Sequence, residues 1–166
     1  MKQLIATAAA AAIFGLASPA SAQAPGAPSV TLVQAVAAAE QAVGAKAFEA
    51  ELDTHRGRLV YEVNLVKDGR AMEAEIDATT GQLVRQSKAS LQMPWDASQL
   101  RAAQLAPKPL AQTIAMIEQS TKGRVTEIGL ERRNQRHYYE VELAGAQDRD
   151  VLVDIQTGAI TPLLDD

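Results

Sequence analysis

The chain has 166 residues, carries 16 basic and 20 acidic side chains, and contains no cysteine. Without thiols there can be no disulfide bonds or thiol chemistry, and we expect no lipid anchor of the bacterial lipoprotein kind. The acidic balance argues against a protein that binds nucleic acids or anionic membranes non-specifically.

Residues 1–22 have the pattern of an export signal. Lys2 is followed by an apolar, alanine-rich stretch over residues 4–16, and then by small residues at the cleavage positions Ala20 and Ala22. The apolar stretch is shorter than the roughly 20 residues that span a bilayer. We therefore expect cleavage after Ala22, a periplasmic or secreted protein without a membrane span, and a flexible mature N-terminus over residues 23–29.

The rest of the chain contains an internal repeat. Residues 32–65 align with residues 110–143 without a gap, and residues 76–83 align with residues 153–160 after the loss of one residue. The lost residue falls where each copy turns between two strands, and turns tolerate such changes. The repeat predicts one module over residues 30–86, a linker over 87–108 and a second module over 109–166.

Each copy begins with the pattern of a short helix. In the first copy Thr31 is a candidate N-cap and Gly44 a candidate stop; in the second the helix begins near Pro109 and ends at Gly123. After each helix, apolar and polar residues alternate as in half-buried strands. In the first copy Phe48, Ala50 and Leu52 are expected to point inward. The linker has its own short helical pattern, over residues 96–105, with Asp96 as N-cap and Trp95 packed beside it.

These patterns predict an α+β fold made of two tandem α-β-β-β-β modules. In each module one helix packs on one face of an antiparallel sheet, and the other face can remain in water. A module of about 60 residues has a marginal core. We therefore expect the two copies to pack on each other or to be joined firmly by the linker.

The strand sequence Tyr61-Glu62-Val63-x-Leu65, followed by Glu-Ile-Asp-Ala-Thr-Thr-Gly-Gln-Leu over residues 75–83, resembles the PepSY domain. The Asp…Thr-Gly ending occurs in both copies. PepSY domains occur in exported bacterial proteins and in the propeptides of secreted metallopeptidases, where they are proposed to inhibit or chaperone the peptidase. The resemblance implies no catalytic residue.

Two repeated turns contain the most conspicuous matched residues, Asp77 with Gly81 and Asp154 with Gly158. One hypothesis is a ligand-binding turn. The favoured interpretation is structural, because an Asp that opens a turn accepts hydrogen bonds from nearby backbone N–H groups and Gly supplies the positive φ.

The outward strand faces are acidic, and Glu62, Glu75, Glu140 and Glu142 are the candidate metal ligands. Carboxylates suit a hard cation such as Ca²⁺, although no loop has the EF-hand spacing. The favoured interpretation is a solvated strand face, since an exposed antiparallel face requires polar residues at alternate positions.

The first hairpin turn of each copy is basic, which gives a candidate partner-binding set. Its residues are Arg56, Arg58, Arg132, Arg133 and Arg136. These tips could dock an acidic partner surface; the simpler interpretation is that they are solvated turns.

The sequence offers no pattern of catalytic residues. His55 and His137 do not correspond between the copies, and neither has the spacing of a zinc site or of a catalytic triad. We therefore expect no cofactor and no enzyme activity, and a hydrolase is the weakest hypothesis. The leading hypothesis is an exported binding or inhibitory module for an unknown protein, with a peptidase as one candidate. The alternative is a periplasmic protein that binds a small ligand or a divalent cation on its acidic face; the oligomeric state stays open.

Overall fold

The computed structural model describes residues 27–88, 95–144 and 150–163. The predicted signal peptide, residues 1–22, lies outside the described residues. The predicted flexible N-terminus lies partly outside them as well. Its last residue, Ser29, donates its backbone N–H to the carbonyl of Ala78 at 2.9 Å.

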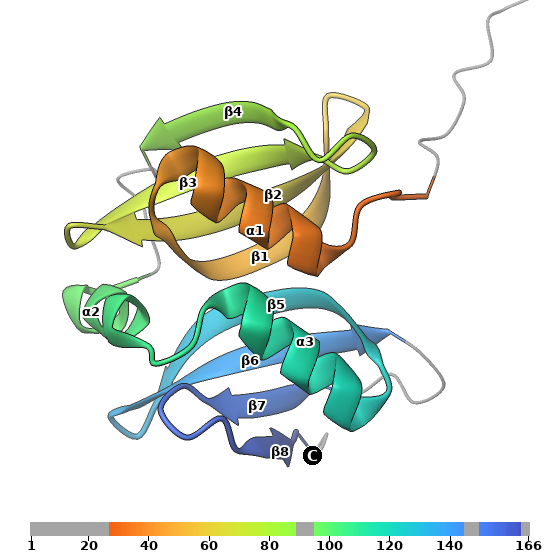
Figure 1. The fold of residues 1–166 in the computed structure, drawn as a ribbon. Coiled ribbons are helices and arrows are strands. Elements are labelled where there is room, and N and C mark those ends of the chain that lie inside the picture. Colours follow the sequence, from red (N-terminus) through yellow and green to blue (C-terminus); the bar gives the residue numbers. More distant parts are fainter. Residues whose placement is uncertain (1–26, 89–94, 145–149, 164–166) are drawn as a thin grey trace, which may run out of the picture.

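The described residues form three helices and eight strands (Figure 1). In chain order they are α1 (Leu32–Val43), β1 (Lys46–His55), β2 (Arg58–Lys67), β3 (Arg70–Asp77), β4 (Leu83–Lys88), α2 (Ala97–Leu105), α3 (Leu110–Thr121), β5 (Arg124–Arg133), β6 (Arg136–Ala144), β7 (Val151–Asp154) and β8 (Ile160–Pro162).

The eight strands form a single antiparallel sheet in the order β4-β3-β2-β1-β5-β6-β7-β8. The copies meet where β1 pairs with β5, with Ala50 opposite Ile128 and Glu51 opposite Glu127. The sequence predicts one sheet for each module, and that part of the prediction is wrong. Each copy has its first strand at an edge, so pairing the two edges satisfies backbone groups of the joint that would otherwise need water.

The first helix has the caps that the sequence predicts. The side-chain oxygen of Thr31 accepts from the backbone of Gln34, whose own side chain accepts from the backbone of Thr31, and Gly44 ends α1 at φ 63°. In α3 the left-handed residue is Lys122, at φ 61°, so this helix ends one residue before the predicted stop at Gly123. An isolated left-handed residue need not be glycine, because packing of the whole helix can offset the small steric cost.

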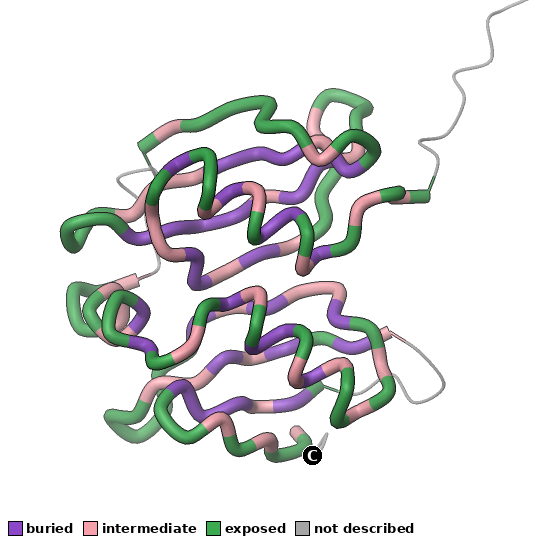
Figure 2. Tube along the Cα trace, in the orientation of Figure 1, coloured by how far each residue is buried: buried purple, intermediate pink, exposed green. Residues whose placement is uncertain are grey.

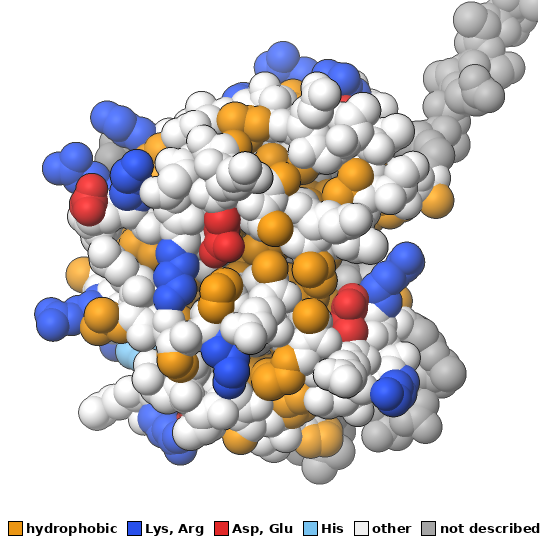
Figure 3. All heavy atoms as spheres, in the orientation of Figure 1, with side chains coloured by type: hydrophobic (Ala, Val, Ile, Leu, Met, Phe, Trp, Pro, Cys, Tyr) orange, Lys and Arg blue, Asp and Glu red, His pale blue; other side chains and the backbone are white. Residues whose placement is uncertain are grey.

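Both long helices lie on the same face of the sheet and contact each other across the joint. Between helices and sheet lies one continuous core, which includes Val36, Val63, Ile114, Ile128 and Val141, all fully buried (Figure 2). On the helix-covered side, hydrophobic side chains gather along the line where the copies meet (Figure 3). The marginal core of one module is thus extended by that of the other.

The strand β1 departs from the expected alternation. A bulge between Ala47 and Glu49 shifts its pairing with β2, and both Ala47 and Phe48 are buried. Leu52, which was expected to point into the core, has 37 % of its surface exposed. It lies near the end of β1, beside a hollow that is also lined by Val30.

The linker contributes the helix α2, which Asp96 caps by accepting from the backbone N–H groups of Ser98 and Gln99. It contacts β1, β2 and β5, and therefore both copies. Trp95 packs edge-on against Phe48, with ring centroids 4.9 Å apart. The predicted packing of Trp95 is confirmed.

Candidate functional site

The sheet face opposite α1 and α3 carries a row of carboxylates, one from each of five neighbouring strands. Cross-strand pairing places Glu62 opposite both Glu75 and Glu51, and Glu127 opposite both Glu51 and Glu142. We call these five residues the acidic row: Glu75, Glu62, Glu51, Glu127 and Glu142. The row runs from the first copy into the second, so it exists only because β1 and β5 pair.

The middle of the acidic row is electrostatically strained. Partial burial raises the pKa of Glu51, Glu62 and Glu127, and the neighbouring carboxylates of the face raise each of these pKa values further. Like charges directly opposite on paired strands oppose folding. A positively charged group bound over the row would relieve this repulsion.

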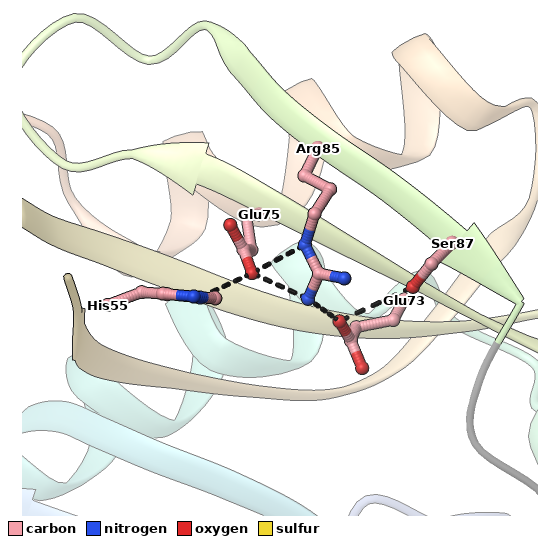
Figure 4. Close-up of polar contacts among 5 residues, drawn as sticks. All are labelled: His55, Glu73, Glu75, Arg85 and Ser87. Carbon is pink, nitrogen blue, oxygen red and sulfur yellow. Dashed lines mark hydrogen bonds and ion pairs between the residues drawn. The ribbon is translucent and has the colours of Figure 1, made fainter.

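The end of the row in the first copy is neutralised by a local network. The Glu75 carboxylate, whose side chain is 6 % exposed, receives the guanidinium of Arg85 at 2.7 Å and lies 2.8 Å from Nδ1 of His55 (Figure 4). Hydrogen bonding to Arg85 lowers the pKa of Glu75. Arg85 also bonds Glu73, which accepts a bond from Ser87 as well.

Beside this network lies a hollow of about 270 Å³. We call it the tip hollow; its walls are His55, Arg56, Arg58, Val60, Glu75, Val84 and Arg85. It combines cationic groups from the β1–β2 turn and from β4 with two valines. It is thus a basic depression at the end of an acidic face.

Another carboxylate of this face, Glu49, lies beneath Trp95 of the linker. Its Oε2 accepts from the indole N–H of Trp95 at 3.1 Å, and its Oε1 accepts from the side-chain amide of Asn64 at 3.2 Å. A Cβ added to Gly129 would lie 3.6 Å from the Glu49 carboxylate, which is an ordinary van der Waals contact. Burial raises the pKa of Glu49 to about 7, although these hydrogen bonds act in the opposite direction.

Two segments of the chain match a known protein family. The PepSY family, described as "Peptidase propeptide and YPEB domain", matches residues 29–86 and 107–161, which together make up more than half of the chain. The chain belongs to the PepSY family. The two matched segments confirm the tandem PepSY resemblance that the repeated Asp…Thr-Gly endings predict.

A solved structure, that of a putative lipoprotein from Clostridium difficile 630, is similar to this PepSY chain at a TM-score of 0.44 and 18 % identity. The similarity covers 81 % of this chain and 91 % of that one. No curated protein matches the chain. Within residues 27–88, 95–144 and 150–163, no helix is both long enough and apolar enough to cross a membrane.

The two basic tips of the tandem PepSY protein do not form one surface. Because β1 and β5 are antiparallel, the β1–β2 and β5–β6 turns lie at opposite ends of the sheet. Most of the predicted partner-binding arginines have carboxylates of the same chain within ion-pair distance. The pairs are Arg58 with Asp77 at 3.5 Å, Arg132 with Asp96 at 3.3 Å, Arg133 with Glu140 at 2.7 Å, and Arg136 with Asp154 at 2.6 Å.

The four predicted metal ligands are also divided between the PepSY copies. Glu62 and Glu75 face each other on β2 and β3, whereas Glu140 and Glu142 lie on β6. Among the described residues, no group of three or more His, Asp or Glu side chains is placed to hold a metal ion. Cation binding therefore stays a prediction for which the described side chains form no ready-made cage.

The repeated Asp and Gly residues make the contacts of a turn. Asp77 Oδ1 accepts from the backbone N–H groups of Thr79 and Thr80, and these bonds lower the pKa of Asp77. Asp154 Oδ1 accepts in the same way from residues 156 and 157. Gly81 and Gly158 have φ values of 72° and 74°.

Sequence reasoning missed Arg85 and the hydrogen bond that Trp95 donates to Glu49. Arg85 meets Glu75 because the pairing of β3 and β4 shifts between Glu75 and Ile76, and no residue pattern announces that irregularity. The acidic row could have been found only in part, since alternation places its members on one face but does not reveal which strand edges join.

Proposed function

We propose that this PepSY protein is an exported, non-enzymatic module that binds a basic surface of another exported protein across its acidic row. The observation that supports the proposal most directly is the register of the row, which places like charges opposite each other on five adjacent strands. Complementary charge on a partner speeds encounter and fixes its orientation. Because of the family's link to peptidase propeptides, we propose a peptidase as the partner, held in check by the bound module.

The test compares three versions of the mature protein as bait for the exported proteins of its host. The row variant carries Glu51→Gln and Glu127→Gln. The control variant carries Asp68→Asn and Glu131→Gln, which remove the same charge from exposed residues outside the row. We expect a partner that is captured by the wild type and the control, but about tenfold less by the row variant, measured by quantitative mass spectrometry.

The captured protein is then purified and titrated against the three versions by calorimetry. If it is a peptidase, its activity is measured with and without an equimolar amount of the PepSY protein. Equal affinity for all three versions would contradict binding through the row, and unchanged peptidase activity would contradict the inhibitory role. A melting temperature that rises with millimolar Ca²⁺ in the wild type but not in the row variant would support the cation-binding alternative instead.

A further inference from the structure

The tip hollow has a positive rim. Its carboxylate, Glu75, is already matched by Arg85 and lies within hydrogen-bond distance of His55. Arg58 has a 65 % exposed side chain, 3.5 Å from Asp77. Within the described part of the chain, Arg56 makes no ion pair. Both turn arginines can therefore reach an incoming anion, because neither is held by a short contact.

The floor of the hollow is apolar. Val60 has only 2 % of its surface exposed, and Val84 from the edge strand β4 has 43 % exposed. A free inorganic anion gains nothing from such a floor, whereas a group that joins a carboxylate to an apolar side chain uses both features. The volume of about 270 Å³ is small for a ligand pocket, which favours a short group over a long segment.

We infer that the tip hollow binds the C-terminal end of a peptide chain. The terminal carboxylate lies against Arg56 and Arg58, and the last side chain, which is apolar, lies on Val60 and Val84. Arginine suits this task because its planar guanidinium donates two parallel hydrogen bonds to one carboxylate.

The second copy lacks several residues of this site and still folds into the same module. In the aligned sequences the positions of Glu75 and Arg85 are held by Leu152 and Pro162 in the second copy, and Arg56 corresponds to Asn134. Both copies nevertheless form the same Asp…Thr-Gly turn between their third and fourth strands, where Asp77 and Asp154 accept matching hydrogen bonds. The network around the tip hollow is therefore not needed to build the module.

This inference adds a site to the proposed function and does not rest on it. Of the acidic row, only Glu75 borders the tip hollow. Variants of Glu51 and Glu127 test the row, and variants of the β1–β2 turn test the hollow, so each proposal can fail without the other.

The probe is the tripeptide N-acetyl-Ala-Ala-Leu with a free carboxylate, compared with the same peptide as its C-terminal amide. Binding to the mature protein is followed by NMR through the backbone amide signals of Val60 and Val84. We expect saturable shifts with the free acid and an affinity about tenfold lower for the amide, since the amide loses the charge-assisted bonds.

The variant Arg56→Asn with Arg58→Gln should lower the affinity for the free acid about tenfold. Asparagine suits position 56 because φ there is 51°, which asparagine tolerates. The matched control, Arg133→Asn with Arg136→Gln, makes the same charge change at the second tip and should leave the affinity unchanged.

Equal shifts with acid and amide, no saturable shift at millimolar peptide, or an equal loss in the control variant would overturn the inference. Isovalerate, a small acid with a similar apolar group, is the last arm of the experiment. If it binds as tightly as the peptide, the assignment to a peptide end is wrong.

Discussion

Glu49 is a partly buried carboxylate whose ionisation opposes folding. Its pKa is about 7 in the folded protein, against 4.5 for an ordinary glutamate. Between these two values the folded state holds a proton that the unfolded state has released. Stability therefore falls as pH rises from about 4.5 to about 7, and the loss is complete above that range.

The variant Glu49→Gln tests this linkage, because glutamine keeps the shape and an oxygen acceptor but does not titrate. At pH 8 we expect a higher free energy of unfolding than in the wild type, by up to about 3 kcal/mol. The difference should shrink toward pH 5. Urea unfolding followed by the fluorescence of Trp95, the single tryptophan, measures it. Glu131→Gln is the control and should leave the pH dependence unchanged.

The turn glycines Gly81 and Gly158 have left-handed backbone conformations that favour glycine. At Gly81 an added Cβ would lie 3.5 Å from a methyl of Val30, an ordinary contact, so the penalty comes from the backbone at φ 72°. We expect Gly81→Ala to lower the free energy of unfolding by about 1–2 kcal/mol, and Gly81→Asn by less, since asparagine tolerates this conformation. Chemical denaturation of the two variants measures the difference; equal losses would show that space, not φ, is limiting.

Of the three described helices, α2 has the fewest buried residues. It is a short helix with a single buried residue, Ala103. It is held by the contacts of Trp95, by a bond from Gln99 to the carbonyl of Leu130, and by a bond from Lys46 to the carbonyl of Ala106. The last two tie the linker to both copies.

The variant Trp95→Phe keeps an aromatic ring against Phe48 but removes the indole N–H. Because Glu49 then loses a donor, we expect stability to fall by about 1–2 kcal/mol, and more above pH 7, where the carboxylate is ionised. The same change made in the Glu49→Gln variant should cost less. Far-UV circular dichroism during urea unfolding measures all four proteins, and equal losses in both backgrounds would show that the two residues are not coupled.

In the molecule as a whole, the pairing of β1 with β5 places the like charges of the acidic row side by side, so the row affects stability. Replacing Glu51 and Glu127 by glutamine removes the repulsion at the centre of the acidic row. We expect the free energy of unfolding to rise by about 0.5–1 kcal/mol for each replacement. Added salt should stabilise the wild type more than the double variant, because salt screens exposed charges. Thermal unfolding at low and high salt measures both effects; a double variant less stable than the wild type would show that the row stabilises the fold.

Features that depend on residues close together in the chain can be predicted from the sequence, whereas features that depend on a neighbouring strand cannot. The cap at Thr31, the stop at Gly44 and the linker helix after Asp96 are local, because each depends on residues within a few positions along the chain. The bulge beside Phe48 and the shifted pairing at Glu75 depend on a neighbouring strand and were not predicted. The pairing of His55, Glu75 and Arg85 depends on three strands and was also missed.

The sequence by itself determined the repeat, the helix-then-strands order of each module and the polar character of the outward strand faces, because periodicity and turn chemistry are written locally. Only the tertiary structure decided that β1 and β5 pair, that Trp95 covers Glu49, and that five carboxylates from two copies form one row. Edge pairing between distant strands leaves no periodic signal, since any exposed strand edge offers the same backbone groups.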